Sequence, residues 1–444
     1  MASTKPARGM RDFLPSDVRK RNYVIGIIRE VYESYGFEPL ETPSIENIET
    51  LMGKYGEEGN QLVFKILKRG EKLDIAGGEA GLADLALRYD LTVPLARVVA
   101  NNKNDLPKFF KRYQIQPVWR ADRPARGRFR EFYQCDVDAI GSASMVVEGE
   151  ILSAVSDILT RLGFEDFTIR LNHRQVLTDI LDTAGVPAEL HTDALVAIDK
   201  LDKIGTEGVA KELLDRGISD SASEMLIGIF EKTTEILNQE HDINRTIVAN
   251  LINIVSNELL TEVGLILKYA EKAPIVIDPS LARGLSYYTG AIMEITVPDL
   301  AGSLGGGGRY DGLIGMFGKE QIPACGFSLG LERILVVMEE KGMFPAEIAA
   351  SRAADVMVTI WDEDSVADSL KLARQLRKQG LSVTVYPEAD KLGKQFKYAD
   401  AIGVPFICMI GDEERSSRKV KLKNMQSGEE WTLKAAEIGA IIAL

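Results

Sequence analysis

Apolar residues recur along the chain with two different periods, which divide it into helical and strand-forming stretches. Residues 17–36, DVRKRNYVIGIIREVYESYG, place apolar side chains three and four positions apart, which predicts a helix that ends at Gly36. Apolar and polar residues alternate over 84–90, 108–120 and 129–141, so these stretches are predicted strands. The last two flank the loop ADRPARGR and therefore predict an antiparallel pair joined by a basic loop.

The middle of the chain is predicted to be a helical insertion. Residues 173–272 show mainly helical spacing, with many acidic and few aromatic side chains. Strand-like patterns return after it, followed by the glycine run SLGGGGRYDGL and by GFSLGLERILVVMEEKG, which predicts a strand or turn leading into a helix. We therefore expect one α+β domain built from residues 1–172 and 273–342.

A second domain is predicted after a linker at residues 343–353. From 354 to 444, apolar runs of strand length alternate with helical spacing at 365–379 and 391–402. This order is typical of an α/β domain with a mixed or parallel sheet.

The composition excludes several kinds of site. The 444 residues carry a formal net charge of −13, which argues against a protein that coats nucleic acid but leaves room for local basic grooves. The three cysteines are far apart and the three histidines form no HExxH motif, so zinc sites and histidine acid–base chemistry are not expected. We find no signal-peptide core and no apolar stretch of about 18 residues, so we expect a cytoplasmic protein without a membrane partner.

Positive charge is concentrated in one short segment. Residues 108–130 hold eight lysines and arginines but a single acid, Asp122. A solvated basic face would explain an ordinary charge run. Here, however, Arg120, Arg128 and Arg130 are predicted to lie on the paired strands, where Arg128 and Arg130 share one face. Guanidinium groups that converge repel each other unless an anion is present, so the pattern favours a bound polyphosphate.

Four other segments carry weaker signals when each is taken alone. LARGLSYYTG (281–290) fits plain strand packing as well as a binding site. GGGGRYDG (305–312) lacks the Lys-Ser/Thr of a Walker A loop and is either a flexible turn or a close approach of the backbone to a ligand. GFSLGLERI begins a predicted helix, and in RYDLTVP the side chains of Asp90 and Thr92 are predicted to share one face of a strand.

In this order the segments resemble class II aminoacyl-tRNA synthetases, and among them histidyl-tRNA synthetases, over nearly the whole chain. YGFEPLETPSIE resembles motif 1, a dimer-interface element. FKRYQIQPVWRADRPARGRFREFYQCD resembles motif 2, and GFSLGLERI resembles motif 3. ARGLSYYTG and GGGGRYDGL resemble the two histidine-specific motifs, and KLGKQFKYADAIGVPFICMIG resembles the C-terminal anticodon-binding domain.

The resemblance implies a fold and an activity. The fold is a class II antiparallel sheet flanked by helices, with a helical insertion and a C-terminal α/β anticodon-binding domain. The activity is that of a histidine–tRNA ligase, which uses ATP and Mg²⁺ to form histidyl-adenylate and then transfers histidine to the 3′ end of tRNA-His. The chain is expected to be a homodimer.

The resemblance also assigns residues by their motifs. Catalytic roles fall to Arg120, Arg283 and Arg333. Histidine is expected to contact Asp90, Thr92, Arg120, Gln134, Asp138, Arg283, Tyr287, Tyr288 and Tyr310. ATP is expected to contact Arg120, Arg128, Arg130, Glu332 and Arg333. The acceptor end of tRNA is expected to contact Arg123 and Arg126, and no protein side chain is assigned to the metal.

The chain departs from the family pattern at two positions, and two other functions remain open. Asp122 and Asp90 stand where many members carry glutamate. One alternative is the regulatory subunit of ATP phosphoribosyltransferase, a histidine sensor that generally lacks the C-terminal domain. The other is a tRNA-binding or stress-sensing module with a degenerate site, which the loss of a motif arginine would favour; all of them are present.

Overall fold

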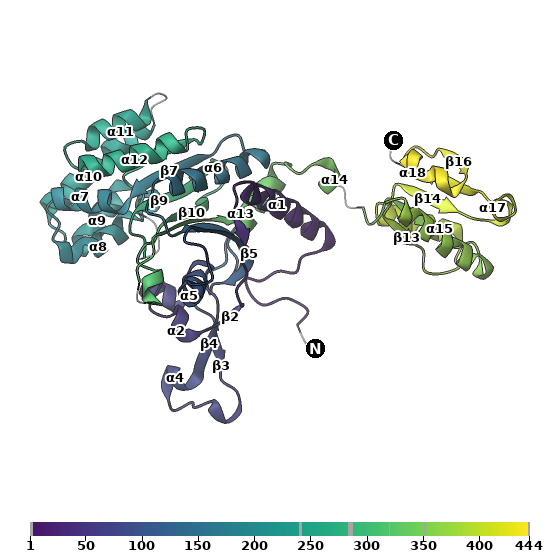
Figure 1. Ribbon diagram of the computed structural model, residues 1–444, viewed down its shortest axis with the longest axis horizontal. Helices are drawn as coiled ribbons and strands as arrows, with labels where there is room; N and C mark the ends of the chain where they lie inside the picture. Colours follow the sequence, from purple (N-terminus) through teal and green to yellow (C-terminus); the bar gives the residue numbers. More distant parts are fainter. Residues whose placement is uncertain (1–2, 239–241, 283–286, 319, 350–351, 443–444) are drawn as a thin grey trace. The chain divides into compact units, whose positions relative to one another are not determined.

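The computed structural model describes residues 3–238, 242–282, 287–318, 320–349 and 352–442. The chain divides into two compact units (Figure 1). The first comprises Met1–Asp12 and Arg21–Met343, and the second comprises Phe13–Lys20 and Phe344–Leu444. The second unit begins inside the predicted linker. It also takes in Phe13–Lys20, which the sequence patterns placed with the first unit.

An eight-stranded sheet forms the centre of the first unit. Its strands are, in spatial order, β1 (Glu38–Pro39), β5 (Phe110–Trp119), β6 (Glu131–Ile140), β11 (Ala324–Gly330), β10 (Ser303–Arg309), β9 (Ala291–Thr296), β7 (Thr168–His173) and β8 (Ile275–Ile277). Neighbouring strands are antiparallel except at the two edges, where β1–β5 and β7–β8 are parallel. The predicted antiparallel sheet is confirmed.

Strand alternation gives this sheet one apolar and one polar face. On β6, Cys135 and Val137 are fully buried in the hydrophobic core. Residues 134, 136 and 138 alternate with them and carry Gln and Asp side chains, which point to the opposite face because successive side chains on a strand point to opposite sides. Helices α1 (Pro15–Ser34), α6 (Val146–Arg161) and α13 (Leu331–Glu340) lie near the sheet in Figure 1, and α6 and α13 contact β6.

A smaller layer packs beside the polar face. It contains β2 (Ile45–Asn47), β3 (Lys65–Leu67) and β4 (Ala83–Leu87), with the short helices α2 (Ile48–Leu51), α3 (Gly56–Gln61) and α4 (Gly78–Leu82) and the longer α5 (Thr92–Asn102). Buried Val93, Leu95 and Ala96 of α5 join the same hydrophobic cluster as Leu51 and Tyr310. This cluster fixes the start of α5 beside the sheet.

The chain leaves β4 earlier than predicted. The strand ends at Leu87, and a turn then carries the chain into α5, which begins at Thr92. The prediction that Asp90 and Thr92 share one strand face is therefore wrong, because Asp90 lies in the turn and Thr92 opens the helix.

The stretch predicted to be helical is helical. It contains α7 (Arg174–Thr183), α8 (His191–Ile198), α9 (Leu201–Asp215), α10 (Asp220–Leu237), α11 (Ile243–Leu251) and α12 (Asn257–Tyr269). The second unit has a mixed sheet in the order β13 (Val383–Val385), β12 (Val356–Val358), β14 (Phe406–Met409), β15 (Val420–Asn424) and β16 (Glu430–Leu433). Its helices include α15 (Val366–Lys378), α16 (Leu392–Ala401), α17 (Asp412–Ser417) and α18 (Ile438–Ile442).

The glycine run is a strand, not a flexible turn. Residues 303–309 form β10, which pairs with β9 and β11 on its two sides. A Cβ atom at Gly307 would lie 2.2 Å from the Gly326 carbonyl oxygen, and one at Gly305 would lie 2.5 Å from that of Ser328. Glycine is needed because no side chain fits against β11 at these positions.

A buried ion pair ties β10 to α6 and gives a test of stability. Arg309 Nε donates to Glu148 Oε1 at 2.6 Å and Nη2 donates to Oε2 at 2.8 Å, with both side chains almost fully buried. In Glu148→Gln the arginine loses its buried counter-charge, so we expect urea denaturation followed by circular dichroism to show about 3–5 kcal/mol less stability. Glu320→Gln breaks an exposed pair with Lys103 and should leave stability almost unchanged, because solvent screens exposed pairs. Equal, small effects of both changes would contradict this account.

Candidate active site

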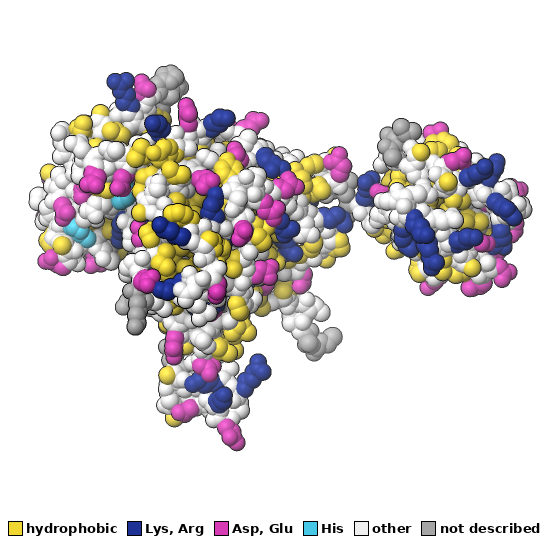
Figure 2. All heavy atoms as spheres, viewed as in Figure 1, with side chains coloured by type: hydrophobic (Ala, Val, Ile, Leu, Met, Phe, Trp, Pro, Cys, Tyr) yellow, Lys and Arg dark blue, Asp and Glu magenta, His cyan; other side chains and the backbone are white. Residues whose placement is uncertain are grey.

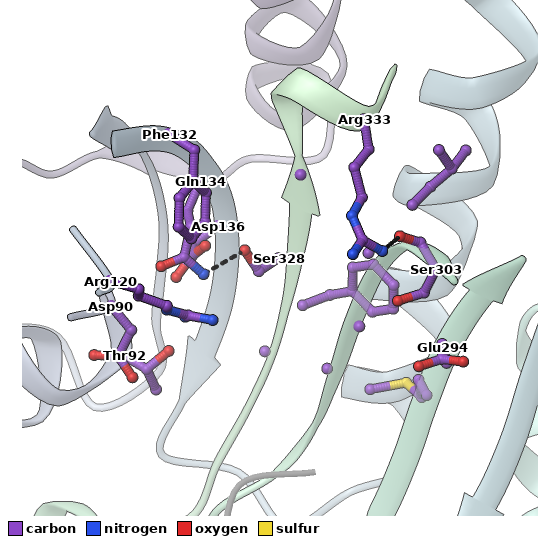
Figure 3. Close-up of a pocket in the computed structure, with 18 of the residues that line it drawn as sticks. Asp90, Thr92, Arg120, Phe132, Gln134, Asp136, Glu294, Ser303, Ser328 and Arg333 are labelled. Atoms are coloured by element: carbon purple, nitrogen blue, oxygen red, sulfur yellow. Dashed lines mark hydrogen bonds between the residues drawn. The ribbon is translucent and has the colours of Figure 1, made fainter. Parts of the chain in front are cut away.

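A cavity of about 440 Å³ lies on the polar face of the central sheet (Figure 3). Strands β6, β9, β10 and β11, the turn after β4 and the start of α13 all contribute to its wall. The predicted site residues among its lining are Asp90, Thr92, Arg120, Arg128, Gln134, Asp138, Tyr287, Tyr288, Tyr310, Glu332 and Arg333. The fold therefore brings together residues from motifs more than 200 positions apart in the sequence.

Asp90 brings a buried negative charge to the wall. Its side chain is 1% exposed, and Oδ1 accepts hydrogen bonds from Tyr55 Oη at 3.0 Å and from the Val93 amide at 3.1 Å. Oδ2 is buried and accepts no hydrogen bond from the described residues. Burial raises the pKa of Asp90, and the positive charge of Arg120 opposes that rise. An unpartnered buried carboxylate oxygen is costly, so it is suited to a cationic ligand group.

Arg120 presents its guanidinium group to the same space. Its Nε donates to the Tyr89 carbonyl at 3.0 Å, and its guanidinium lies over the rings of Tyr89 and Phe132, at 4.3 and 5.2 Å from their centres. Stacking of this kind holds the planar group in one orientation. Within the described parts of the chain its terminal nitrogens form no hydrogen bond or ion pair, so they can bind an anion in the cavity.

The other arginines of the basic segment do not lie as predicted. Strand β5 ends at Trp119 and β6 begins at Glu131, so Arg120, Arg128 and Arg130 all lie in the connecting loop. The prediction that they lie on the two strands is wrong, because Ala125 and Arg128 pair with each other and tighten the loop. Arg128 Nη2 donates to Asp122 Oδ1 at 2.8 Å beside the cavity.

Three arginines of the loop lie away from the cavity lining. Arg130 Nε donates to the Asp122 carbonyl at 3.0 Å, and its amide donates to Gly9. Arg123 is exposed, while Arg126 is paired with Glu340 of α13. Their predicted contacts with ATP and tRNA stay predictions.

Helix α13 brings two predicted residues to the far wall. Arg333 Nη1 donates to the Ser303 carbonyl, opposite Arg120 in Figure 3. Glu332 is 3% exposed and its Oε2 accepts the Tyr133 amide at 3.0 Å. Burial raises the pKa of Glu332 to about 7, so this carboxyl titrates near neutrality.

Three tyrosines and one aspartate enclose another part of the cavity. The ring centres of Tyr287 and Tyr288 are 5.3 Å apart, those of Tyr287 and Tyr310 are 5.9 Å apart, and both pairs meet edge to face. Tyr310 Oη donates to Asp138 Oδ1. A Cβ atom at Gly326 would lie 1.9 Å from Asp138 Oδ1, so glycine makes room for this carboxylate.

Two predicted histidine contacts remain. Gln134 lines the cavity, and its Nε2 donates to Ser328 Oγ at 2.9 Å. Arg283 lies outside the described residues.

Sequence reasoning missed Asp136 and Glu294 of the cavity wall, and Arg112, which contacts the lining residue Asp138. Arg112 is fully buried on β5, and its Nη2 lies 2.8 Å from Asp138 Oδ2 and 3.9 Å from Asp136 Oδ2. Asp136 and Glu294 line the cavity and are almost fully buried. The sequence signal that could have identified Arg112 and Asp136 is the polar residue at every second position of β5 and β6, in strands that are otherwise apolar.

Comparison with known proteins agrees with this arrangement. Residues 9–334 match the family model described as histidyl-tRNA synthetase, and residues 355–443 match a model described as an anticodon binding domain. The chain belongs to the histidyl-tRNA synthetase family. It is 42% identical to the histidine–tRNA ligase of Christiangramia forsetii over 96% of each chain, and 42% identical to that of Porphyromonas gingivalis over 98% of each chain.

The likeness to a solved structure extends over the whole chain. The crystal structure of histidyl-tRNA synthetase from Nostoc superposes with a TM-score of 0.79 at 31% identity, covering 100% of this chain and 99% of that one. The expected class II fold and histidine–tRNA ligase activity are confirmed. The match of residues 355–443 to an anticodon binding domain favours the synthetase over the regulatory-subunit alternative. Among the described helices of this synthetase, none is long and apolar enough to span a membrane.

The buried Glu332 carboxyl gives a test by pH. Its folded pKa of about 7 lies above the ordinary value of 4.5, so the folded state holds the proton more tightly than the unfolded state. Its contribution to stability is therefore greatest below pH 4.5 and is lost as the pH rises to about 7. In Glu332→Gln this loss disappears, so we expect the variant to gain on the order of 2 kcal/mol relative to the parent between pH 5 and pH 8. Denaturation curves across that range measure the difference; a constant difference would refute the raised pKa.

Proposed function

We propose that the 440 Å³ cavity is where this synthetase activates histidine and then passes it to tRNA. In the first step an oxygen of the histidine carboxylate attacks the α-phosphorus of ATP, and pyrophosphate leaves. In the second step the terminal adenosine hydroxyl of tRNA-His attacks the carbonyl of histidyl-adenylate, and AMP leaves. Both steps depend mainly on positioning and on neutralising negative charge, for which arginines suffice.

One observation carries this assignment. The unpartnered Oδ2 of Asp90 and the stacked guanidinium of Arg120 line the same wall. An α-amino acid carries an ammonium group and a carboxylate on one carbon atom, so it complements this pair of charges. Asp90, with Thr92 and Gln134, binds the ammonium group, and Arg120 holds the carboxylate against the α-phosphate.

The remaining residues divide between histidine and ATP. Asp138, Tyr287, Tyr288 and Tyr310 surround the imidazole ring. Arg333 binds the far phosphates, and Arg128 and Glu332 bind the nucleotide from the loop and from α13. Arg130 supports the loop through Asp122, and Arg283 supplements the charge at the α-phosphate by the resemblance of its motif.

Mg²⁺ fits the donor set as a companion of ATP. No cluster of three or more potential metal ligands occurs among the described residues, so no all-protein cage is available. Mg²⁺ commonly takes one or two carboxylates together with phosphate oxygens. Glu294 and Glu332 line the cavity and would supply these carboxylates, and the bound ion would neutralise phosphate charge.

The partners of the reaction contact other surfaces. Arg123 and Arg126 of the motif 2 loop meet the acceptor end of tRNA, and the helical insertion grips the acceptor arm. The second unit binds the anticodon. Figure 2 shows several Lys and Arg side chains on the surface of this unit, and the exposed lysines of α16 are suited to contact phosphates. The motif 1 segment joins two chains into a homodimer, which works in the cytoplasm.

The first test is ATP–pyrophosphate exchange with each of the twenty amino acids, with and without Mg²⁺. We expect exchange with histidine alone, dependent on Mg²⁺, followed by charging of tRNA-His. Exchange driven by another amino acid, or histidine binding without exchange, would overturn the assignment.

Arg120 offers a sharper test of mechanism. Arg120→Lys keeps a positive charge but loses the planar fork and its stacking on Tyr89. We expect kcat for exchange to fall about 100-fold or more, since comparable transition-state donors contribute that much. Lys103→Arg, at an exposed ion pair, serves as the control and should leave exchange unchanged. Arg120→Lys with near-parental kcat would remove Arg120 from the reacting centre.

A further inference from the structure

Two aspartates of β6 reach the cavity, and they differ in how far their oxygens are already used. In Asp138, Oδ1 accepts a hydrogen bond from Tyr310, and Oδ2 lies 2.8 Å from Arg112 Nη2 in an ion pair but accepts no hydrogen bond from the described residues. Asp136 is 2% exposed and lines the same cavity, yet its Oδ1 accepts no hydrogen bond from the described residues. The oxygen without a hydrogen bond is held by Arg112 in Asp138, whereas in Asp136 the ion pair with Arg112 uses the other oxygen, Oδ2.

Arg112 compensates the charge of Asp136 only in part. Its Nη2 is 3.9 Å from Asp136 Oδ2 but 2.8 Å from Asp138 Oδ2. Asp138 is therefore the closer partner of Arg112, and Asp136 shares the same guanidinium group at longer range. A carboxyl compensated only in part is costly to bury unless a ligand completes it.

The surroundings of Asp136 define what that ligand must offer. Arg112 faces Asp136 from β5, and Asp138 lies two residues further along β6. Ser328 is the partner of Asp136 in the register of β11, and Asp90, in the turn after β4, adds a negative charge. Tyr288, Tyr32 and Arg88 also interact electrostatically with Asp136. Burial raises the pKa of Asp136 to about 7; the positive charge of Arg112 and a hydrogen bond with Ser328 oppose the rise, and the negative charge of Asp138 adds to it. The excess of carboxyls favours a ligand group that donates hydrogen bonds.

The cavity wall thus holds three buried carboxylate oxygens that accept no hydrogen bond from the described residues, Oδ2 of Asp90, Oδ1 of Asp136 and Oδ2 of Asp138, and Arg112 holds the last of them in an ion pair. Histidine carries two donor groups, its ammonium group and the N–H of its imidazole ring. We propose that Asp136 is a specificity-determining residue whose Oδ1 accepts the ring N–H of histidine, while Asp90 binds the ammonium group. The inference rests on the proposed function of this cavity. It adds Asp136 to Asp138 and the three tyrosines around the ring.

The test is Asp136→Asn, which keeps the size of the side chain and removes its charge. We expect KM for histidine to rise about 10- to 100-fold in ATP–pyrophosphate exchange, because hydrogen bonds to charged groups contribute about 1.5–3 kcal/mol. KM for ATP should change less than about twofold. Glu150→Gln, which alters a partly buried ion pair with Lys111 away from the cavity lining, is the control and should leave both KM values unchanged.

A pH series separates ligand recognition from a structural effect. The ratio of histidine KM values, variant over parent, should be largest above pH 7 and should fall below it, because a protonated Asp136 resembles asparagine in charge. A ratio that is flat with pH, or KM values for histidine and ATP that rise together, would overturn the proposal, as would an unchanged histidine KM. Failure of the parent protein to exchange with histidine would instead overturn the proposed function itself.

Discussion

The ion pair of Arg112 with Asp138 is the contact on which the rest of the cavity depends. Both groups are buried on neighbouring strands, and their nearest atoms are 2.8 Å apart. An arginine without this partner would be a buried, uncompensated charge, which costs several kcal/mol. With the pair in place, Asp138 is fixed, Tyr310 is oriented by its hydrogen bond to Asp138, and Tyr287 packs against Tyr310. One buried pair thereby orders a wall that reaches across the cavity.

Glycines leave the remaining surface of the sheet without side chains, so a ligand can lie against the backbone. Gly326 leaves room for the Asp138 carboxylate, and Gly305 and Gly307 allow β10 and β11 to approach closely. A side chain at any of these positions would meet a backbone or carboxylate oxygen at 2.5 Å or less. The same sheet face therefore combines exposed backbone with a few charged groups, which is suited to a flat nucleotide and a small amino acid.

Sequence patterns predicted the elements well and the directions of single side chains less well. The strands around the basic loop, the helical insertion and the α/β character of the second unit follow from periodicity alone. The loop residues Arg128 and Arg130 do not, because local pairing and Asp122 decide where they point. Arg112 and Asp136 were missed because alternation shows that they share a polar face of the sheet. It does not show that other elements cover this face and bury them. That depends on contacts between β5, β6 and β11, which join distant parts of the chain.

The cavity is built for binding at some cost to stability. Buried acceptors on Asp90, Asp136 and Gln134 have no partner among the described residues, and each such group costs free energy in the empty protein. A ligand that supplies the missing donors recovers that free energy, and one that lacks them leaves the acceptors unsatisfied. An apolar amino acid of similar size would bring the ammonium group for Asp90 but no donor for the ring site. On the roles proposed for these residues, the unpartnered oxygens let one cavity bind the ammonium group common to all amino acids and select histidine by its side chain.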